Sequence, residues 1–182
     1  MGRMSRRERR LQDIHINEAG EAVYTGRMLR ISGNGGRTRL YLALGLAGLA
    51  AAVIGSGCID APGTTNTFYV ILPFLGEVCA LFALAWQAVK VIAGREGVRA
   101  YVHEAADKTV PGACRVLSVF ALFGLAAALC YLLRSGAGMS AKAVAYLVLK
   151  ILAAAGAERY GRFWRGLRWE DACAARERTR FS

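Results

Sequence analysis

The sequence predicts an all-α integral membrane protein. We expect a bundle of four transmembrane helices with both termini in the cytoplasm, a small N-terminal β-hairpin and a basic amphipathic C-terminal helix. Hydrophobic residues make up 55% of the 182 residues and fall in long blocks with few charges, as membrane-spanning helices require. Basic residues flank these blocks, and the formal net charge is +11. Block length and the placement of charge therefore predict both the fold class and its orientation.

The chain divides into three parts by composition. A basic tail with a hairpin and a Gly-rich link is expected over 1–36, a transmembrane domain over 37–157 and a basic amphipathic tail over 158–182. The expected spans are about 40–58, 68–91, 116–133 and 140–157. Each is long enough, at ~1.5 Å per residue, to cross a hydrocarbon core of about 30 Å. Lys150 interrupts the fourth, so a re-entrant or interfacial segment is the alternative there.

Lysine and arginine fall mostly on alternate connections between the spans. Of the 24, nine precede residue 40, five lie between residues 90 and 115, and seven follow residue 158. The connection 58–67 has none and the connection 134–142 has two. The positive-inside rule therefore places both termini on the cytoplasmic side of the cell (inner or plasma) membrane. An odd number of spans would separate the two arginine-rich tails, which favours four.

The N-terminal tail contains the pattern of a β-hairpin. Within residues 12–31, Ile14 and Ile16 alternate with polar neighbours, NEAGE supplies a turn, and VYTGRMLRI is rich in strand-forming residues. Two strands alone are marginal in water, so the hairpin needs a partner. The following SGNGG predicts a flexible link into the first span.

The connection between the second and third spans predicts a short helix that ends near Pro111. His103 and Asp107 would share a face of this helix at positions i and i+4, beside Glu104. Ordinary pairing on a solvated face is favoured over catalysis for this group.

The C-terminal tail has the pattern of a helix that lies at a membrane surface. Aromatic and apolar residues recur at positions i, i+3, i+4 and i+7, and arginines surround them. This pattern suits the headgroup layer, with anionic lipids as partners. The expected headgroup contacts are Arg159, Arg162, Trp164, Arg165 and Arg168. Nucleic acid is not expected as a partner, because lipid lies next to these residues.

Two charged residues lie inside the predicted spans. Counted from Phe68 at ~1.5 Å per residue, Glu77 lies about 13 Å from the outer end of the second span. Counted from Lys142 in the same way, Lys150 lies about 12 Å from the outer end of the fourth. Each charge alone costs a few kcal/mol near the centre of a span. The similar depths predict an ion pair, with the Tyr146 hydroxyl donating a hydrogen bond to the carboxylate.

The pair has two interpretations. As a structural device, which is the favoured interpretation, it determines which helices are neighbours and how they are rotated. As a functional device, it marks a polar cavity for an ion, a proton or a small polar ligand. In the alternative without a pair, Lys150 extends to the interface and Glu77 is protonated.

Cysteine, histidine and small residues add weaker expectations. The five cysteines and two histidines form no metal-binding spacing, so neither a metal nor a cofactor is expected. Cys58 and Cys130 fall near the outer ends of their spans, where two buried free thiols are favoured over a disulfide. Rows of small residues in the first span, such as Gly48, Ala52 and Ser56, suit close helix contacts. Contacts within the bundle are favoured, and a homodimer through these faces is the alternative.

The sequence favours a protein without catalytic activity. The absence of a catalytic constellation, the short outer connections and the basic cytoplasmic surface favour a structural, accessory or lipid-contacting membrane protein. The alternative is an oligomeric small transporter or channel for an ion, a proton or a small polar solute, with Glu77 in its polar path. A third hypothesis is a lipid-modifying membrane enzyme, which would need reactive groups at the membrane edge.

Overall fold

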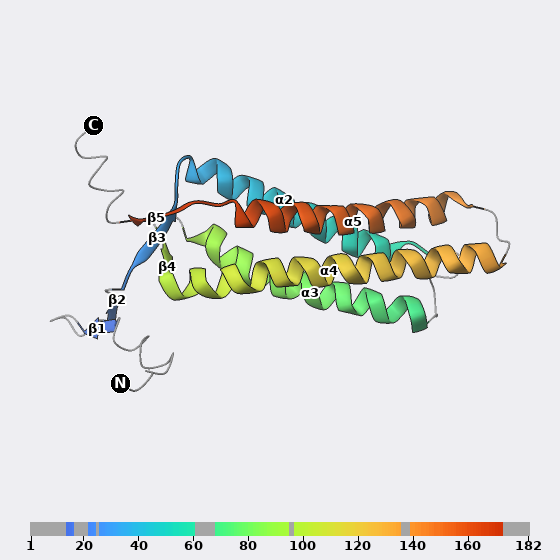
Figure 1. The fold of residues 1–182 in the computed structure, drawn as a ribbon, viewed down its shortest axis with the longest axis horizontal. Helices are drawn as coiled ribbons and strands as arrows, with labels where there is room; N and C mark the ends of the chain where they lie inside the picture. Colours follow the sequence, from blue (N-terminus) through green and yellow to red (C-terminus); the bar gives the residue numbers. More distant parts are fainter. Residues whose placement is uncertain are drawn as a thin grey trace.

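Four long helices run side by side and form the body of the protein (Figure 1). The computed structural model describes residues 14–16, 22–24, 26–60, 68–94, 97–135 and 139–172, with side chains from residue 26 onward. The helices are α2 (Gly35–Cys58), α3 (Phe68–Ala93), α4 (Ala100–Ser135) and α5 (Ala141–Arg165). Short strands gather at the end of the bundle where α2 and α4 begin and where α3 and α5 end (Figure 1).

Three of these helices, α2, α3 and α4, are long and apolar enough to cross a membrane, which suggests a membrane protein. The remaining helix, α5, has 25 residues, but Lys150 and the charged residues of its last turns interrupt its apolar character. The structure is therefore mostly helical, with three candidate spans, one more helix of similar length and a small sheet.

The first helix begins at Gly35, earlier than the predicted start near residue 40. Gly33 has a φ of 79°, a left-handed conformation that favours glycine. Asn34 follows as the N-cap, and its side-chain oxygen accepts a hydrogen bond from the Arg37 backbone N–H at 3.3 Å. The segment expected to be a link therefore forms a capping turn and the start of α2, because turn and capping residues have the same composition as a linker.

The helix expected to end near Pro111 is also longer than predicted. Pro111 lies inside α4, which continues through the third predicted span. A proline inside a helix removes a backbone hydrogen bond and costs about 3 kcal/mol in water. Val110, Ala113 and Cys114 are buried around it, so tertiary packing offsets this cost. At ~1.5 Å per residue α4 is roughly 54 Å long, so its first turns extend beyond a hydrocarbon core of about 30 Å.

The N-terminal hairpin is present as β1 (Ile14–Ile16) and β2 (Ala22–Tyr24), which pair antiparallel with Ile14 opposite Tyr24. Its predicted turn, the first basic residues of the chain and the end of the C-terminal tail lie outside the described residues. The segment expected to extend the second strand instead forms a separate strand, β3 (Met28–Ile31). That part of the hairpin prediction is wrong.

A second sheet joins three segments that are far apart in the sequence. Its strand order is β4 (Val98–Arg99), β3 and β5 (Trp169–Asp171), and both pairings are antiparallel. Leu29 lies opposite Val98 on one side and opposite Asp171 on the other. The segment before α2, the connection between α3 and α4, and the segment after α5 therefore meet at one end of the bundle.

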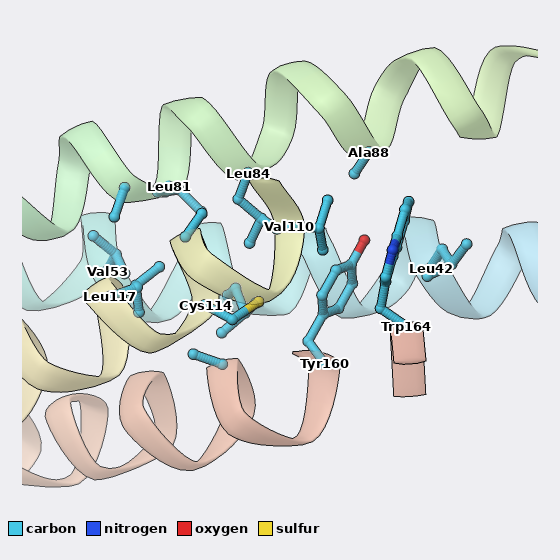
Figure 2. Close-up of a cluster of buried hydrophobic side chains, with 14 of the residues drawn as sticks. Leu42, Val53, Leu81, Leu84, Ala88, Val110, Cys114, Leu117, Tyr160 and Trp164 are labelled. Atoms are coloured by element: carbon cyan, nitrogen blue, oxygen red, sulfur yellow. The ribbon is translucent and has the colours of Figure 1, made fainter. Parts of the chain in front are cut away.

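The main hydrophobic core lies between the helices and extends from their middle to the sheet. Leu84, Leu117 and Trp164 are among its largest buried side chains (Figure 2). Ile31 of β3 and Val98 of β4 belong to the same cluster, so the sheet packs on the end of the bundle. A second, smaller cluster of Val70, Ala128, Tyr146 and Leu147 lies toward the opposite end.

Candidate functional site

The structure brings Glu77 of α3 and Lys150 of α5 together. The Lys150 ammonium donates a hydrogen bond to Glu77 Oε1 with an N···O distance of 2.6 Å. Both side chains have an exposed fraction of 0%. This is the contact that the similar depths in the sequence predict. An opposite charge at hydrogen-bonding distance offsets part of the cost of burying each ion.

A third helix makes room for the pair. Gly124 of α4 lies against it: a Cβ atom on this residue would be 3.3 Å from Lys150 Cε and 3.5 Å from Glu77 Oε1. The contact is tighter than most packing contacts of a Cβ atom, so a larger residue would displace one of the charged side chains. Sequence reasoning missed this role, although Gly124 and Ala128 are small residues four positions apart, a spacing typical of close helix contact.

Two aromatic rings complete the surroundings of the ammonium. Lys150 Nζ is 5.4 Å from the centre of the Phe74 ring and 5.3 Å from the centre of the Tyr146 ring. Both distances allow cation–π attraction. The two rings therefore stabilise the positive charge of Lys150 in addition to the carboxylate.

The predicted role of Tyr146 is wrong in its chemistry. Its hydroxyl does not donate to the carboxylate: within the described ranges, the buried Tyr146 Oη has no hydrogen-bond partner. The ring, not the hydroxyl, contacts the pair. Glu77 Oε2 is likewise buried and has no partner among the described residues. Two polar atoms of the site, a carboxylate oxygen and a hydroxyl, are therefore buried without a hydrogen bond to any described residue.

The pair lies between the two hydrophobic clusters. Along α3, Glu77 lies between Val70 of the smaller cluster and Leu81 of the larger one. Along α5, Lys150 lies between Leu147 of the smaller cluster and Ala153 of the larger one. Apolar side chains therefore flank the charges toward both ends of the bundle. Because the local dielectric constant is low there, the attraction between the two charges is strong.

The arginines expected at the headgroups lie on the surface, as such contacts require. All four, Arg159, Arg162, Arg165 and Arg168, are exposed. The Arg162 guanidinium lies 4.0 Å from Glu158, one turn earlier on α5. Arg165 Nε donates to the Gly161 carbonyl at 3.3 Å, which satisfies one of the last carbonyls of the helix.

The prediction that Trp164 contacts lipid headgroups is wrong. Its side chain is 1% exposed, and Figure 2 shows the indole pointing from α5 into the core beside the Tyr160 ring. It cannot contact headgroups from there. The expected aromatic stripe faces the protein because α5 continues in the bundle to Arg165 and then turns into β5. A basic surface helix over the whole tail is therefore also wrong for the described residues.

His103, expected to share a helix face with Asp107, makes a contact with the second sheet. Its ring lies edge-on to the Trp169 ring of β5, with 4.3 Å between the centroids. Burial lowers the pKa of His103 from its ordinary value, and the nearby Asp107 carboxylate opposes this shift. Glu104 pairs with Lys108 at 2.7 Å. The first turns of α4 thus connect to the sheet through an aromatic contact that the sequence pattern did not indicate.

Cysteines and potential metal ligands are dispersed in the structure. Cys58 and Cys130 are free and exposed, so the expectation that these thiols are buried is wrong. Within the described ranges, no three His, Cys, Asp or Glu side chains gather in a group that could hold a metal ion.

Comparisons of the chain with protein-family models, with curated proteins and with solved structures find no match. Functional inference therefore depends on the geometry of the chain itself.

Proposed function

We propose that the chain is a four-span protein of the cell membrane, with both termini in the cytoplasm. In this proposal it acts without catalysis, as a structural or accessory protein that contacts anionic lipid. The Glu77–Lys150 pair serves as a structural pin that connects α3 and α5 across the bundle, since each of these helices packs against α2 and α4.

The observation that carries the topology is the sheet β4-β3-β5. Its strands come from before α2, between α3 and α4, and after α5. If α2, α3 and α4 cross the membrane, β3 and β4 lie on one side of it, and α5 starts on the other. Since β5 pairs with β3, α5 must return across the membrane. The excess of basic residues on these same segments supports the cytoplasm as that side.

Within this fold α5 can cross despite its charge. Lys150, near the middle of α5, is fully buried against a carboxylate and does not face lipid. A paired and buried charge avoids most of the cost of exposing an ion to hydrocarbon. The composition of α5 alone is therefore a poor guide to whether it spans.

Thiol labelling in intact cells tests the topology. In a background without native cysteines, we expect Met139→Cys to react with a membrane-impermeant maleimide. Lys108→Cys and Gly166→Cys should react only after permeabilisation, because they precede the third span and follow the fourth. Labelling of Gly166→Cys together with Met139→Cys in intact cells would place the end of α5 outside and refute four spans.

A small transporter or channel is the second candidate, and one observation favours it. Glu77 Oε2 and Tyr146 Oη are both buried without hydrogen-bond partners among the described residues. An ionisable side chain inside a span often marks a polar pathway. Solute flux in vesicles separates the two functions. A transport role predicts that Glu77→Gln abolishes flux in a folded protein, whereas the structural pin predicts no specific flux in either form.

A further inference from the structure

A groove on the outside of the bundle runs between α2 and α5. Its volume is about 720 Å³, within the range of small-molecule sites. Gly45, Gly48 and Ala52 line it from α2, and Gly156 lines it from α5. Figure 1 shows α2 crossing α5 at an angle. These residues have little or no side chain, so the two helices leave a hollow where they diverge.

The surroundings of the glycines show that no other side chain fills the groove beside Gly48. A Cβ atom on Gly48 would meet nothing within 4 Å. A Cβ atom on Gly45 would lie 3.0 Å from the Tyr160 ring, so this buried ring forms part of the floor. The groove is therefore apolar and closed toward the core, and open on the side that faces lipid in the proposed topology.

Cationic and aromatic side chains surround one end of the groove. Arg159, Tyr41 and Phe163 line it there. Arg37 Nε donates to Tyr41 Oη at 3.2 Å, and its guanidinium lies 5.7 Å from the centre of the same ring. Arg159 forms no ion pair within the described part of the chain, whereas Arg162 pairs with Glu158. This end lies toward the sheet, which is the cytoplasmic side in the proposed topology.

We propose that the groove binds one anionic phospholipid of the cytoplasmic leaflet. An acyl chain lies along the small residues, and the phosphate accepts hydrogen bonds from Arg159 and from the Arg37 group beside Tyr41. Arginine suits this role because its planar donors match phosphate oxygens. The inference rests on the proposed membrane topology.

The length of the groove agrees with this occupant. From Tyr41 to Ala52 it extends along α2 for roughly 16 Å at ~1.5 Å per residue. Half of a hydrocarbon core of about 30 Å is ~15 Å. The hollow therefore matches the depth of one leaflet, with its basic end at the level of the headgroups.

A second copy of the chain is the competing occupant, and charge disfavours it. Copies in one membrane share one orientation, so contact through this groove would bring the Arg37 and Arg159 regions of both close together at the same depth. Each chain also carries a net charge of +11. Like charges at an interface oppose association, whereas an anionic headgroup complements them.

Native mass spectrometry of the full chain in detergent tests the proposal, with phosphatidylglycerol and phosphatidylcholine as probes. We expect the unaltered protein to retain phosphatidylglycerol preferentially. Arg159→Gln should reduce this preference about fivefold, the factor that corresponds to the ~1 kcal/mol of one basic side chain near an anionic surface. Lys142→Gln is the matched control on the same helix, because Lys142 is exposed but lies at the opposite end of α5, outside the groove. It should leave the preference unchanged.

Gly48→Leu tests the apolar part of the groove separately. It should reduce the retention of both lipids because the new side chain occupies the space of the acyl chain. Gly112→Leu is its control, since a Cβ atom there also meets nothing within 4 Å but lies outside the groove. Equal lipid retention by all four variants would overturn the proposal. So would a dimer of the unaltered protein that Gly48→Leu converts to a monomer, which would show the second copy as the occupant. Either result leaves the labelling test of topology unaffected.

Discussion

Among the ion pairs of the described residues, two have nearly equal length but opposite surroundings. Glu77 and Lys150 meet at 2.6 Å with both side chains fully buried. Arg27, directly before β3, and Asp171 of β5 meet at 2.7 Å, with side chains that are 77% and 41% exposed. The distance between the charges therefore does not determine how much an ion pair contributes to stability. In the buried site each charge depends on the other for compensation, whereas water compensates the exposed charges when they separate.

The largest expected effect follows from removing one partner of the buried pair. Lys150→Met should lower the free energy of unfolding by about 3–5 kcal/mol, because the Glu77 carboxylate keeps no compensating charge. The double variant Glu77→Leu/Lys150→Met should recover most of this loss, since apolar side chains of similar volume replace both ions. Unfolding of the purified protein in detergent measures both.

Lys108→Met is the control for this prediction. Lys108 also pairs with a glutamate, but its side chain is 62% exposed, so its loss should have little effect. If the three variants are equally stable, the buried pair is not the structural pin that we propose.

The next effect concerns the space beside the buried pair. Gly124→Leu should destabilise the protein by about 1–3 kcal/mol, because the new side chain must displace Lys150 or Glu77 in a packed site. Gly112→Leu, at a helix position with open space, should not destabilise it. Thermal unfolding in detergent compares the two. Equal midpoints would contradict the role of Gly124 as the residue that admits the pair.

A smaller effect is expected at the sheet, where His103 contacts Trp169. Burial lowers the pKa of His103, so the folded state binds this proton more weakly than the unfolded state does. Stability should therefore fall as the pH drops below about 6.5, the ordinary value for histidine, and level off below the folded pKa. His103→Phe keeps an aromatic ring against Trp169 and should reduce the difference between unfolding midpoints at pH 7.5 and pH 5. An unchanged difference would mean that other groups cause it.

The smallest effect is expected at the exposed pair. Arg27→Gln should leave the unfolding midpoint unchanged within the error of the measurement, because water replaces the lost partner. Added salt should abolish any residual difference. A loss of stability as large as that of Lys150→Met would contradict the prediction that burial makes the two pairs differ.

Much of the helical architecture could be predicted from composition and spacing. The apolar blocks correspond to α2, α3, the later part of α4 and α5, and the depth count brought Glu77 and Lys150 to the same level. Helix ends were harder, because the capping turn at Gly33 and Asn34 resembles a flexible link and Pro111 resembles a stop. In both places local composition allows two structures, and contacts with the rest of the chain select one.

The sequence by itself determined where apolar and charged residues lie along each helix, since that pattern follows from the cost of exposing each type to water or lipid. Only the tertiary structure decided which face of each helix meets another helix. In a membrane protein both the lipid-facing and the protein-facing surfaces are apolar, so periodicity does not separate them. For this reason the burial of Trp164, the place of Gly124 beside the ion pair and the pairing of β3 with β5 became visible only in the folded chain.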